Sequence, residues 1–189
     1  MTTLSPPQPA TSTKQRVALV LMGAWLAGTV CTSVVATENF YTIDRLLAGS
    51  PNAAFATAVQ RLGGPQARDL LRYLSSELNR LYFQLWNVAQ IAIGAAALWL
   101  IGRDRALTRA RWGVVAMVSS VALMLVWLTP AIVSLGRSLD FVPRDPSPPG
   151  MQRFWVLHAA YTSLEMVKLV AGIVVTMWIT RTVSPGRAS

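Results

Sequence analysis

The stretch 154–179, FWVLHAAYTSLEMVKLVAGIVVTMWI, is the last long apolar run of the chain and decides its fold class. A helix rises about 1.5 Å per residue, so this run is long enough to cross a hydrocarbon core of about 30 Å. It nevertheless carries ionisable groups near its middle, which are costly when they face lipid. We therefore expect a membrane helix whose polar stripe faces other helices or a wet cavity.

The polar stripe is defined by the periodicity of the helix. At 100° per residue, His158 and Glu165 fall within about 20° of each other. Thr162 lies on the same side, Tyr161 adjoins it and Lys168 flanks it. Glu165 and Lys168 are three residues apart, a spacing at which side chains meet. The pair either fixes helix packing or belongs to a path for protons or solutes, and the stem of Lys168 is long enough to snorkel toward the interface.

Composition restricts the class of protein. The chain has 189 residues, of which 53% are hydrophobic and 13% charged, as expected for one compact membrane unit. The net charge of +9 comes from basic residues that flank apolar runs, which the positive-inside rule explains without a nucleic-acid partner. Cys31 is the single cysteine, so an intrachain disulfide and a cysteine-cluster metal site are excluded.

No cofactor or catalytic motif is present in the sequence. A metal site needs several ligands, and His158 is the single histidine. The sequence contains no nucleophile elbow, phosphate-binding loop or paired-histidine zinc motif. We therefore expect neither a cofactor nor a metal, and we assign no catalytic residue.

Three further apolar runs complete an all-α, four-helix transmembrane bundle. The expected spans are 17–36, 81–102, 112–135 and 154–180, within a membrane domain at 16–181 between a disordered tail at 1–15 and a tail at 182–189. A cleaved signal peptide is the alternative for the first run, whose length of about 20 residues favours a retained span. Gly23, Ala27 and Cys31 form a small-residue seam there, typical of close helix packing.

The first loop, 37–66, is expected to hold a pair of amphipathic helices. Turn signals at 49–51 and 63–65 bracket a short helix over 52–62. From Pro65 a second helix runs into span two and carries leucines on one face. We expect those leucines to dock against the bundle or lipid, while the polar face stays wet. The leucines are Leu70, Leu71, Leu74, Leu78 and Leu81, and the polar face holds Arg68, Arg72, Ser76 and Asn79.

Span three and the basic residues give the remaining expectations. Pro130 removes a helix hydrogen bond and crowds the carbonyl of Val126, so we expect a kink in span three.

Basic residues are densest in the two tails and in the turn between spans two and three, which predicts that both termini are cytoplasmic. These residues are Lys14, Arg16, Arg103, Arg105, Arg109, Arg111, Arg181 and Arg187.

With the spans placed, the second half of the chain resembles the transmembrane protein 205-like family of small four-span proteins, a domain of unknown function. The resemblance rests on Thr129-Pro130-x-Ile132 with Arg137, and on Phe154-x-x-x-His158. The chain departs from the family at Tyr161, where a serine is usual, and at Glu165, where an asparagine is usual. The resemblance implies the four-span fold and no particular activity.

Two functions remain open at this point. The first is a structural or partner-assisting membrane protein, whose partners would be the lipid bilayer and either a second copy or a membrane complex. The second is a transporter or proton-coupled permease component built on the stripe. Glu38, at the far end of span one, extends the stripe into a chain Glu38–His158–Glu165 if spans one and four are neighbours.

Overall fold

The computed structural model describes residues 12–49 and 52–183. Residues 1–11 and 184–189 of the predicted tails at 1–15 and 182–189, and Ser50 and Pro51 of the first turn, lie outside the described residues. The predicted tail bounds are too wide, because residues 13–15 belong to the first helix and residues 182–183 to the last. The described chain forms helices and no strand. The elements in chain order are α1 (Thr13–Ala48), α2 (Ala53–Leu62), α3 (Gly64–Ile101), η1 (Arg105–Leu107), α4 (Thr108–Leu123), η2 (Met124–Leu128), α5 (Thr129–Ser138) and α6 (Met151–Val183).

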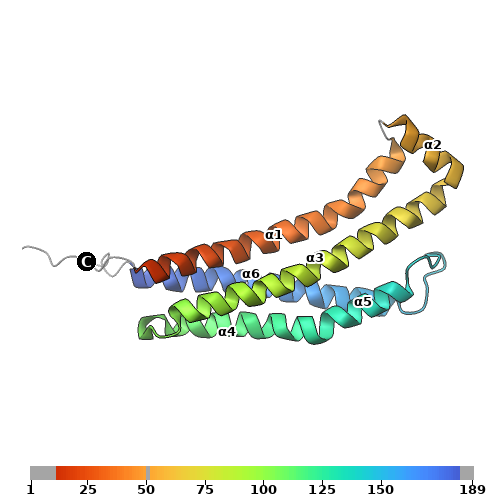
Figure 1. The fold of residues 1–189 in the computed structure, drawn as a ribbon. Helices are drawn as coiled ribbons and strands as arrows, with labels where there is room; N and C mark the ends of the chain where they lie inside the picture. Colours follow the sequence, from red (N-terminus) through yellow and green to blue (C-terminus); the bar gives the residue numbers. More distant parts are fainter. Residues whose placement is uncertain (1–11, 50–51, 184–189) are drawn as a thin grey trace, which may run out of the picture.

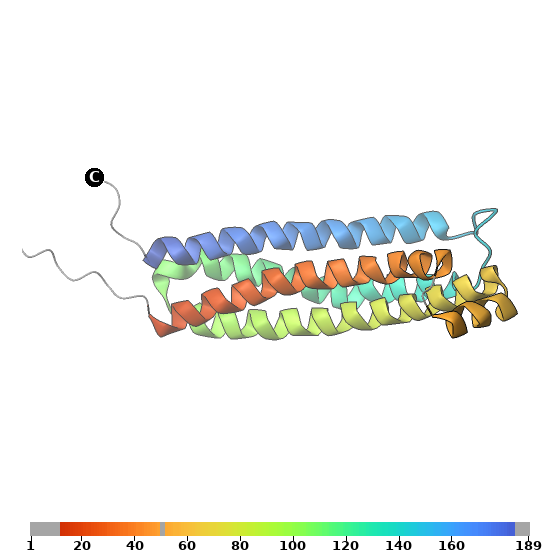
Figure 2. The same cartoon turned by 90° about the horizontal axis from the view of Figure 1, so that it is seen from above.

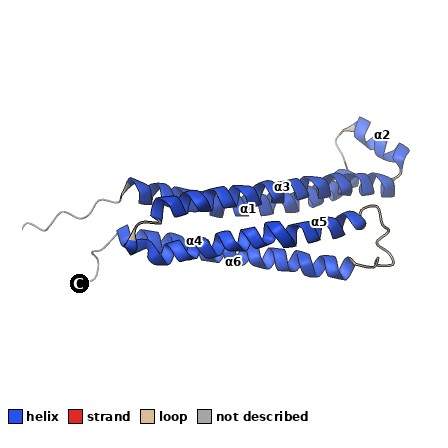
Figure 3. Ribbon diagram, turned by 60° about the horizontal axis from the view of Figure 1, so that its bottom comes forward, coloured by secondary structure: helices blue, strands red, loops and turns tan. Residues whose placement is uncertain are grey.

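The predicted fold class is confirmed, since four helical units are long and apolar enough to cross a membrane. The helices form a ring in which α1 packs on α3, α3 on α4, α4 on α6 and α6 on α1. Figure 3 shows the α1–α3 pair as one layer and the α4–α6 pair as the other. Val20, Trp99 and Val126 are 70–79% exposed on the outside of the bundle, as lipid-facing residues would be. The chain is an integral, multi-pass membrane protein.

The two ends of the bundle differ. The first turn of α1 and the last turn of α6 lie together with the α3–α4 turn at one end, which we call the terminal end (Figure 2). α2 and the α5–α6 loop, residues 139–150, lie at the other end, which we call the loop end (Figure 1). At about 1.5 Å per residue, the 36 residues of α1 and the 38 of α3 span far more than a hydrocarbon core of about 30 Å. Both helices therefore extend beyond the bilayer.

α1 begins at a capping box, in which the Ser12 hydroxyl accepts from the Gln15 backbone and the Gln15 side chain accepts from the Ser12 backbone. It continues to Ala48, well past the predicted end of span one. The predicted seam of Gly23, Ala27 and Cys31 is wrong as a contact within the bundle, because all three residues are exposed. Gly28 does the packing instead.

Close packing at Gly28 joins α1 to α3. A Cβ added there would overlap the ring of Trp86, so only glycine lets the indole lie against the α1 backbone. Gly23, by contrast, has nothing within 4 Å of the corresponding position. The seam lies on the wrong face because the buried side of α1 is set by Ala18, Met22 and Trp25, which are all 0% exposed.

The predicted loop helices are present. Asn52 caps α2, and Gly63, with φ +91°, makes the turn into α3. α3 runs unbroken from the amphipathic segment through span two, as expected. Of the two surfaces predicted for the leucine face, the bundle does not cover Leu70, Leu74 and Leu81, which are 48–55% exposed. Leu71 and Leu78 are half-buried, and contact of this face with lipid stays a prediction.

The polar side of α3 packs on α1 instead. The Asn79 amide donates to the Ala36 carbonyl at 2.9 Å, and the Ser75 hydroxyl donates to the Asn39 carbonyl at 3.2 Å. Arg68 stays wet, as expected, and pairs with Asp44 of α1 at 2.6 Å. Because α1 continues as a helix at the loop end, it offers polar partners to α3, and the leucines are left to face the lipid interface.

The predicted kink before Pro130 takes the form of a π turn. The Thr129 backbone amide donates to the Met124 carbonyl five residues back, which closes the π-helical segment η2. The widened turn removes the need for a hydrogen bond from Pro130, which has no amide proton. The chain changes direction between α4 and α5 (Figure 1), and α5 then reaches the loop end.

The hydrophobic core fills the terminal half of the bundle. Side chains from α1, α3, α4 and α6 pack there with almost no exposure, and Gly94 lets Trp25 and Val118 approach the α3 backbone. The fully buried core residues are Ala18, Met22, Trp25, Ala97, Ile101, Leu107, Ala110, Val114, Met117, Val121, Val175 and Ile179. Toward the loop end, α1 and α3 curve away from α5 and α6 in the view of Figure 1.

Candidate functional site

A buried polar network lies between α1, α3 and α6, above the apolar core. The Lys168 ammonium donates to Glu165 Oε1 at 2.9 Å and to Gln90 Oε1 at 2.7 Å. The Gln90 amide lies 3.5 Å from Glu165 Oε2 and 3.4 Å from the Thr29 hydroxyl. Lys168 is 1% exposed, so it does not snorkel, and the predicted pairing with Glu165 is present. The network links three helices through one ammonium and one amide.

A second branch of polar contacts joins α6 to α3 and α5. The Tyr161 hydroxyl donates to Asn87 Oδ1 at 3.4 Å, and the Asn87 amide donates to the Thr129 hydroxyl at 3.2 Å. Asn87 is 0% exposed and Thr129 5%. The π turn in front of Pro130 sets the position of Thr129 at the start of α5, so the kink and the polar branch belong to one arrangement.

A large cavity connects this network with the loop end. Its volume is about 660 Å³, and it is lined by α1, α3, α6 and the α5–α6 loop. We call it the loop-end cavity. Arg72 and Arg144 line it at the loop end, and Glu165 lines it at its floor. Glu165 is ten residues beyond Trp155 on α6, so the cavity reaches about 15 Å along that helix.

Aromatic residues form a large part of the walls of the cavity. Four of the five phenylalanines and three of the four tyrosines of the chain line it. Tyr73 on α3 contacts Phe141 of the loop with 5.2 Å between ring centroids, which holds the loop beside the first turns of α3. The aromatic lining residues are Phe40, Tyr41, Tyr73, Phe83, Phe141, Phe154, Trp155 and Tyr161.

His158 lies on the cavity wall between Phe154 and Trp155. Its ring stacks on Phe154 at 5.9 Å with an interplanar angle of 16° and meets Trp155 edge-on at 5.9 Å. Thr162, one turn further along α6, lines the cavity and donates its hydroxyl proton to the His158 carbonyl at 3.1 Å. The imidazole is therefore positioned by its own helix and not by a hydrogen bond to a neighbouring one.

A smaller pocket of about 140 Å³ opens beside the cavity toward α5. We call it the side pocket. Its apolar walls come from Phe83, Ile132, Val133 and Leu139. Phe40, Phe154, His158, Tyr161 and Arg144 line both the side pocket and the loop-end cavity, so the two spaces adjoin.

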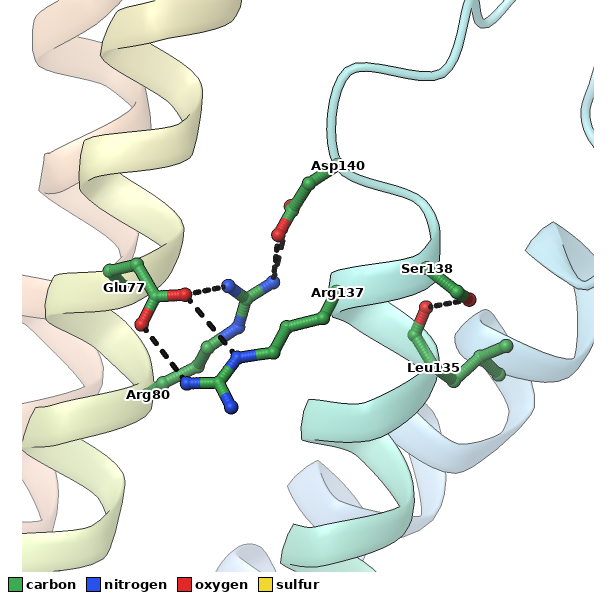
Figure 4. Close-up of polar contacts among 6 residues, drawn as sticks. All are labelled: Glu77, Arg80, Leu135, Arg137, Ser138 and Asp140. Atoms are coloured by element: carbon green, nitrogen blue, oxygen red, sulfur yellow. Dashed lines mark hydrogen bonds and ion pairs between the residues drawn. The ribbon is translucent and has the colours of Figure 1, made fainter.

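An ion-pair cluster closes the loop end of the side pocket (Figure 4). Arg80 pairs with Glu77 on its own helix and with Asp140 of the loop at 2.9 Å. Arg137 of α5 reaches the same Glu77 carboxylate at 3.4 Å. Glu77 precedes the apolar segment 81–102, and the hydrogen bond from Arg137, with Arg80 beside it, holds the pKa of its carboxyl below the usual range.

The predicted chain Glu38–His158–Glu165 does not form. Glu38 pairs with Arg45 of α1 at 2.7 Å, and neither the cavity nor the side pocket includes it. Its carboxylate is about half exposed at the outside of the bundle. The neighbouring face of α1, which carries Ser33, Thr37 and Phe40, lines the cavity instead. Within the described residues, no group of three or more potential ligands is close enough to hold a metal.

Gln90 and Asn87 belong to the site, although the polar stripe predicted from the sequence did not include them. Both are 0% exposed and join the two polar branches to α3. Their signal is present in the sequence, because two amide side chains three residues apart in an apolar span lie on one face and require partners. No family model, curated protein or solved structure matches the chain.

Proposed function

We propose that this integral membrane protein handles a solute, which it admits from the loop end into the cavity above the Glu165–Lys168–Gln90 network, as a component of a transporter or permease. The observation that carries the proposal is the cavity of about 660 Å³, which runs from the exposed loop to a buried carboxylate. Ligand sites in proteins are typically cavities of about 300–1,000 Å³. The walls of this cavity combine aromatic residues with about as many polar ones.

The arrangement supports access from one side. Met22, Trp25, Met117 and Val175 close the bundle between the network and the terminal end, each with at most 2% exposure. Glu165, by contrast, is 8% exposed and lines the cavity. A solute that enters from the loop end therefore passes Arg72 and Arg144 first, then the aromatic walls, and reaches Glu165 last.

The sharpest test is the reactivity of single cysteines in sealed proteoliposomes. In a Cys31→Ala background, Thr162→Cys places a thiol on the cavity wall, and Ser163→Cys places one on the adjacent position, which is also exposed but lies outside the cavity. A charged, membrane-impermeant thiol reagent needs water and a thiolate. We expect Thr162→Cys to react at least tenfold faster than Ser163→Cys when the loop end is accessible. Equal, slow rates would refute the proposal.

Proton flux tests the role of Glu165 separately. Glu165→Gln keeps the size of the side chain and the contact with Lys168, so the bundle should fold. If Glu165 handles protons, the reconstituted variant should lose the flux that the parent protein supports. An unchanged proton flux would leave the cavity intact and remove Glu165 from the mechanism.

A structural or partner-assisting role is the second candidate function. It is supported by the network itself, in which Lys168, Glu165 and Gln90 find their polar partners within the bundle. A buried pair of this kind can fix helix register without any solute. The partner would then be a second copy or a subunit of a membrane complex.

We also propose cytoplasmic termini and membership of the transmembrane protein 205-like family. The orientation is supported by the arginines at the α3–α4 turn, where positive residues favour the cytoplasmic side. The family assignment is supported by the four-span plan and by its motif residues, since Thr129, Arg137 and His158 all line or brace the same region of the bundle.

A further inference from the structure

We propose that the solute is a small aromatic anion, with its ring in the side pocket and its carboxylate on Arg144. This inference names the substrate class of the site and rests on the proposed function. Three features carry it: the size of the side pocket, the chemistry of its walls and the state of the arginine at its boundary.

The size of the side pocket matches one aromatic ring. Its volume is about 140 Å³, and a cavity of about 150 Å³ lined by apolar side chains binds benzene. Ile132 and Val133 supply aliphatic walls, and Phe83 and Phe154 supply ring faces and edges. Aromatic side chains interact favourably with a further ring in edge-to-face or offset geometry.

Arg144 is an exposed cation at the boundary of the two spaces. It lines both the side pocket and the loop-end cavity. Its Nη1 contacts the Met151 sulfur at 3.4 Å, and no described carboxylate pairs with it. A thioether is a weak acceptor, so most of the N–H groups of the guanidinium are open to water or to a ligand. A carboxylate would take two parallel hydrogen bonds from such a group.

Among the described residues that line the side pocket, Arg144 is the cation left for an anion. Arg80 also lines the side pocket, but Glu77 and Asp140 already neutralise it. At the floor of the cavity, Lys168 neutralises Glu165. Arg72 adds a second cation at the loop end, where Asp69 also lies. An organic cation would find aromatic faces here, but its approach would pass Arg72 and Arg144.

The test uses 4-fluorobenzoate as the probe, with 4-fluorobenzamide and 4-fluorobenzylamine as its neutral and cationic counterparts. Binding to the full-length protein in detergent is followed by fluorine NMR line broadening. We expect the anion to bind at least tenfold more tightly than either counterpart, because charged hydrogen bonds outweigh neutral ones. Preferential binding of the benzylamine would overturn the assignment in favour of a cation site.

Matched variants locate the probe. Arg144→Gln should weaken 4-fluorobenzoate binding at least tenfold. Arg153→Gln changes an arginine that is also exposed but lines neither space, and should leave the binding unchanged. Val133→Phe should block the side pocket and abolish binding. Equal losses of binding affinity in Arg144→Gln and Arg153→Gln would show that the probe responds only to the positive charge of the surface, and would overturn the proposal.

The thiol reaction separates this inference from the proposed function. A bound 4-fluorobenzoate should slow the modification of Thr162→Cys in the Cys31→Ala background, since Thr162 lines the adjoining cavity. If Thr162→Cys reacts with the reagent but 4-fluorobenzoate does not bind, the aromatic-anion assignment fails and the open cavity stands. If Thr162→Cys does not react at all, the proposed function fails as well.

Discussion

At the scale of single residues, Lys168 joins the helices at the centre of the bundle. It is the largest charged side chain among the fully buried residues, and it bonds Glu165 on its own helix and Gln90 on α3. A buried charge is tolerated only with such partners, because its desolvation is costly. The hydrogen bond from Lys168 to Gln90 therefore ties the position of α6 to that of α3, whatever solute the cavity takes.

The pair gives a prediction about stability. Lys168→Met removes the ammonium and leaves Glu165 and Gln90 without their main donor. Losing one partner of a dry buried pair costs about 3–5 kcal/mol. Because Glu165 reaches a cavity wide enough for water, we expect a smaller loss of about 1–3 kcal/mol in the free energy of unfolding, measured by reversible denaturation in mixed micelles.

The double variant is the control for this prediction. Glu165→Leu together with Lys168→Met removes both charges, and Thr29 remains as a partner for the Gln90 amide. We expect its free energy of unfolding to return to within about 1 kcal/mol of the parent, since interhelical polar contacts in membranes average well below about 1 kcal/mol. A double variant less stable than Lys168→Met would contradict this account.

At the scale of elements, two kinds of contact hold α1 against α3, one at the loop end and one within the membrane. At the loop end, Ser75 and Asn79 of α3 bond backbone carbonyls of α1. Within the membrane, Gly28 allows the Trp86 ring to lie against the α1 backbone. The hydrogen bonds of Ser75 and Asn79 orient the loop-end extensions of α1 and α3, which form walls of the cavity. The contact between Gly28 and Trp86 sets the distance between the two helices in the bilayer.

Two glycines of α1 provide a matched test of this packing. Gly28→Leu would force Trp86 out of its place, and overpacking of this kind costs about 1–3 kcal/mol. Gly23→Leu adds the same side chain five residues earlier, where nothing lies within 4 Å. We expect Gly28→Leu to lower the unfolding midpoint and Gly23→Leu to leave it unchanged. A loss of stability at Gly23 alone would show that its exposed face contacts another chain.

At the scale of the whole molecule, the bundle is asymmetric along its axis. The terminal half is a closed apolar core, whereas the loop half holds the cavity, the side pocket and the ion-pair cluster. The direction from which a solute arrives therefore depends on how the protein is threaded. The arginine-rich turn at 103–111 lies at the terminal end, so positive-inside threading turns the cavity away from the cytoplasm.

The threading is tested with reporters fused at both ends of the bundle. A reporter inserted in the turn at 103–111 should show that this turn lies in the cytoplasm. The matched insertion in the α5–α6 loop, between Asp145 and Gly150, should show that this loop lies outside the cytoplasm. Reversed activities would turn the cavity toward the cytoplasm and require the thiol experiment to be read from the opposite side.

The sequence alone determined the elements and the membrane setting. Apolar runs of the right length predicted four membrane-spanning helices. In hydrocarbon the backbone N–H and C=O groups of each run must bond to one another, and a helix allows this. Turn residues fixed the loop helices, and Pro130 fixed the break in span three, since it lacks an amide proton. The spacing of Glu165 and Lys168 fixed their pairing, because that contact is made within one helix.

Only the tertiary structure decided what faces what between helices. Helix faces made of small residues or leucines can contact either lipid or protein. Periodicity therefore could not predict whether Gly23 and Leu70 point into the bundle, and both lie on its outside. Whether Glu38 or Gln90 met the polar stripe depended on the rotation of α1 and α3 about their axes. That rotation is set by the fit of many side chains at once, Trp25 and Trp86 among them, and no local pattern in the sequence encodes it.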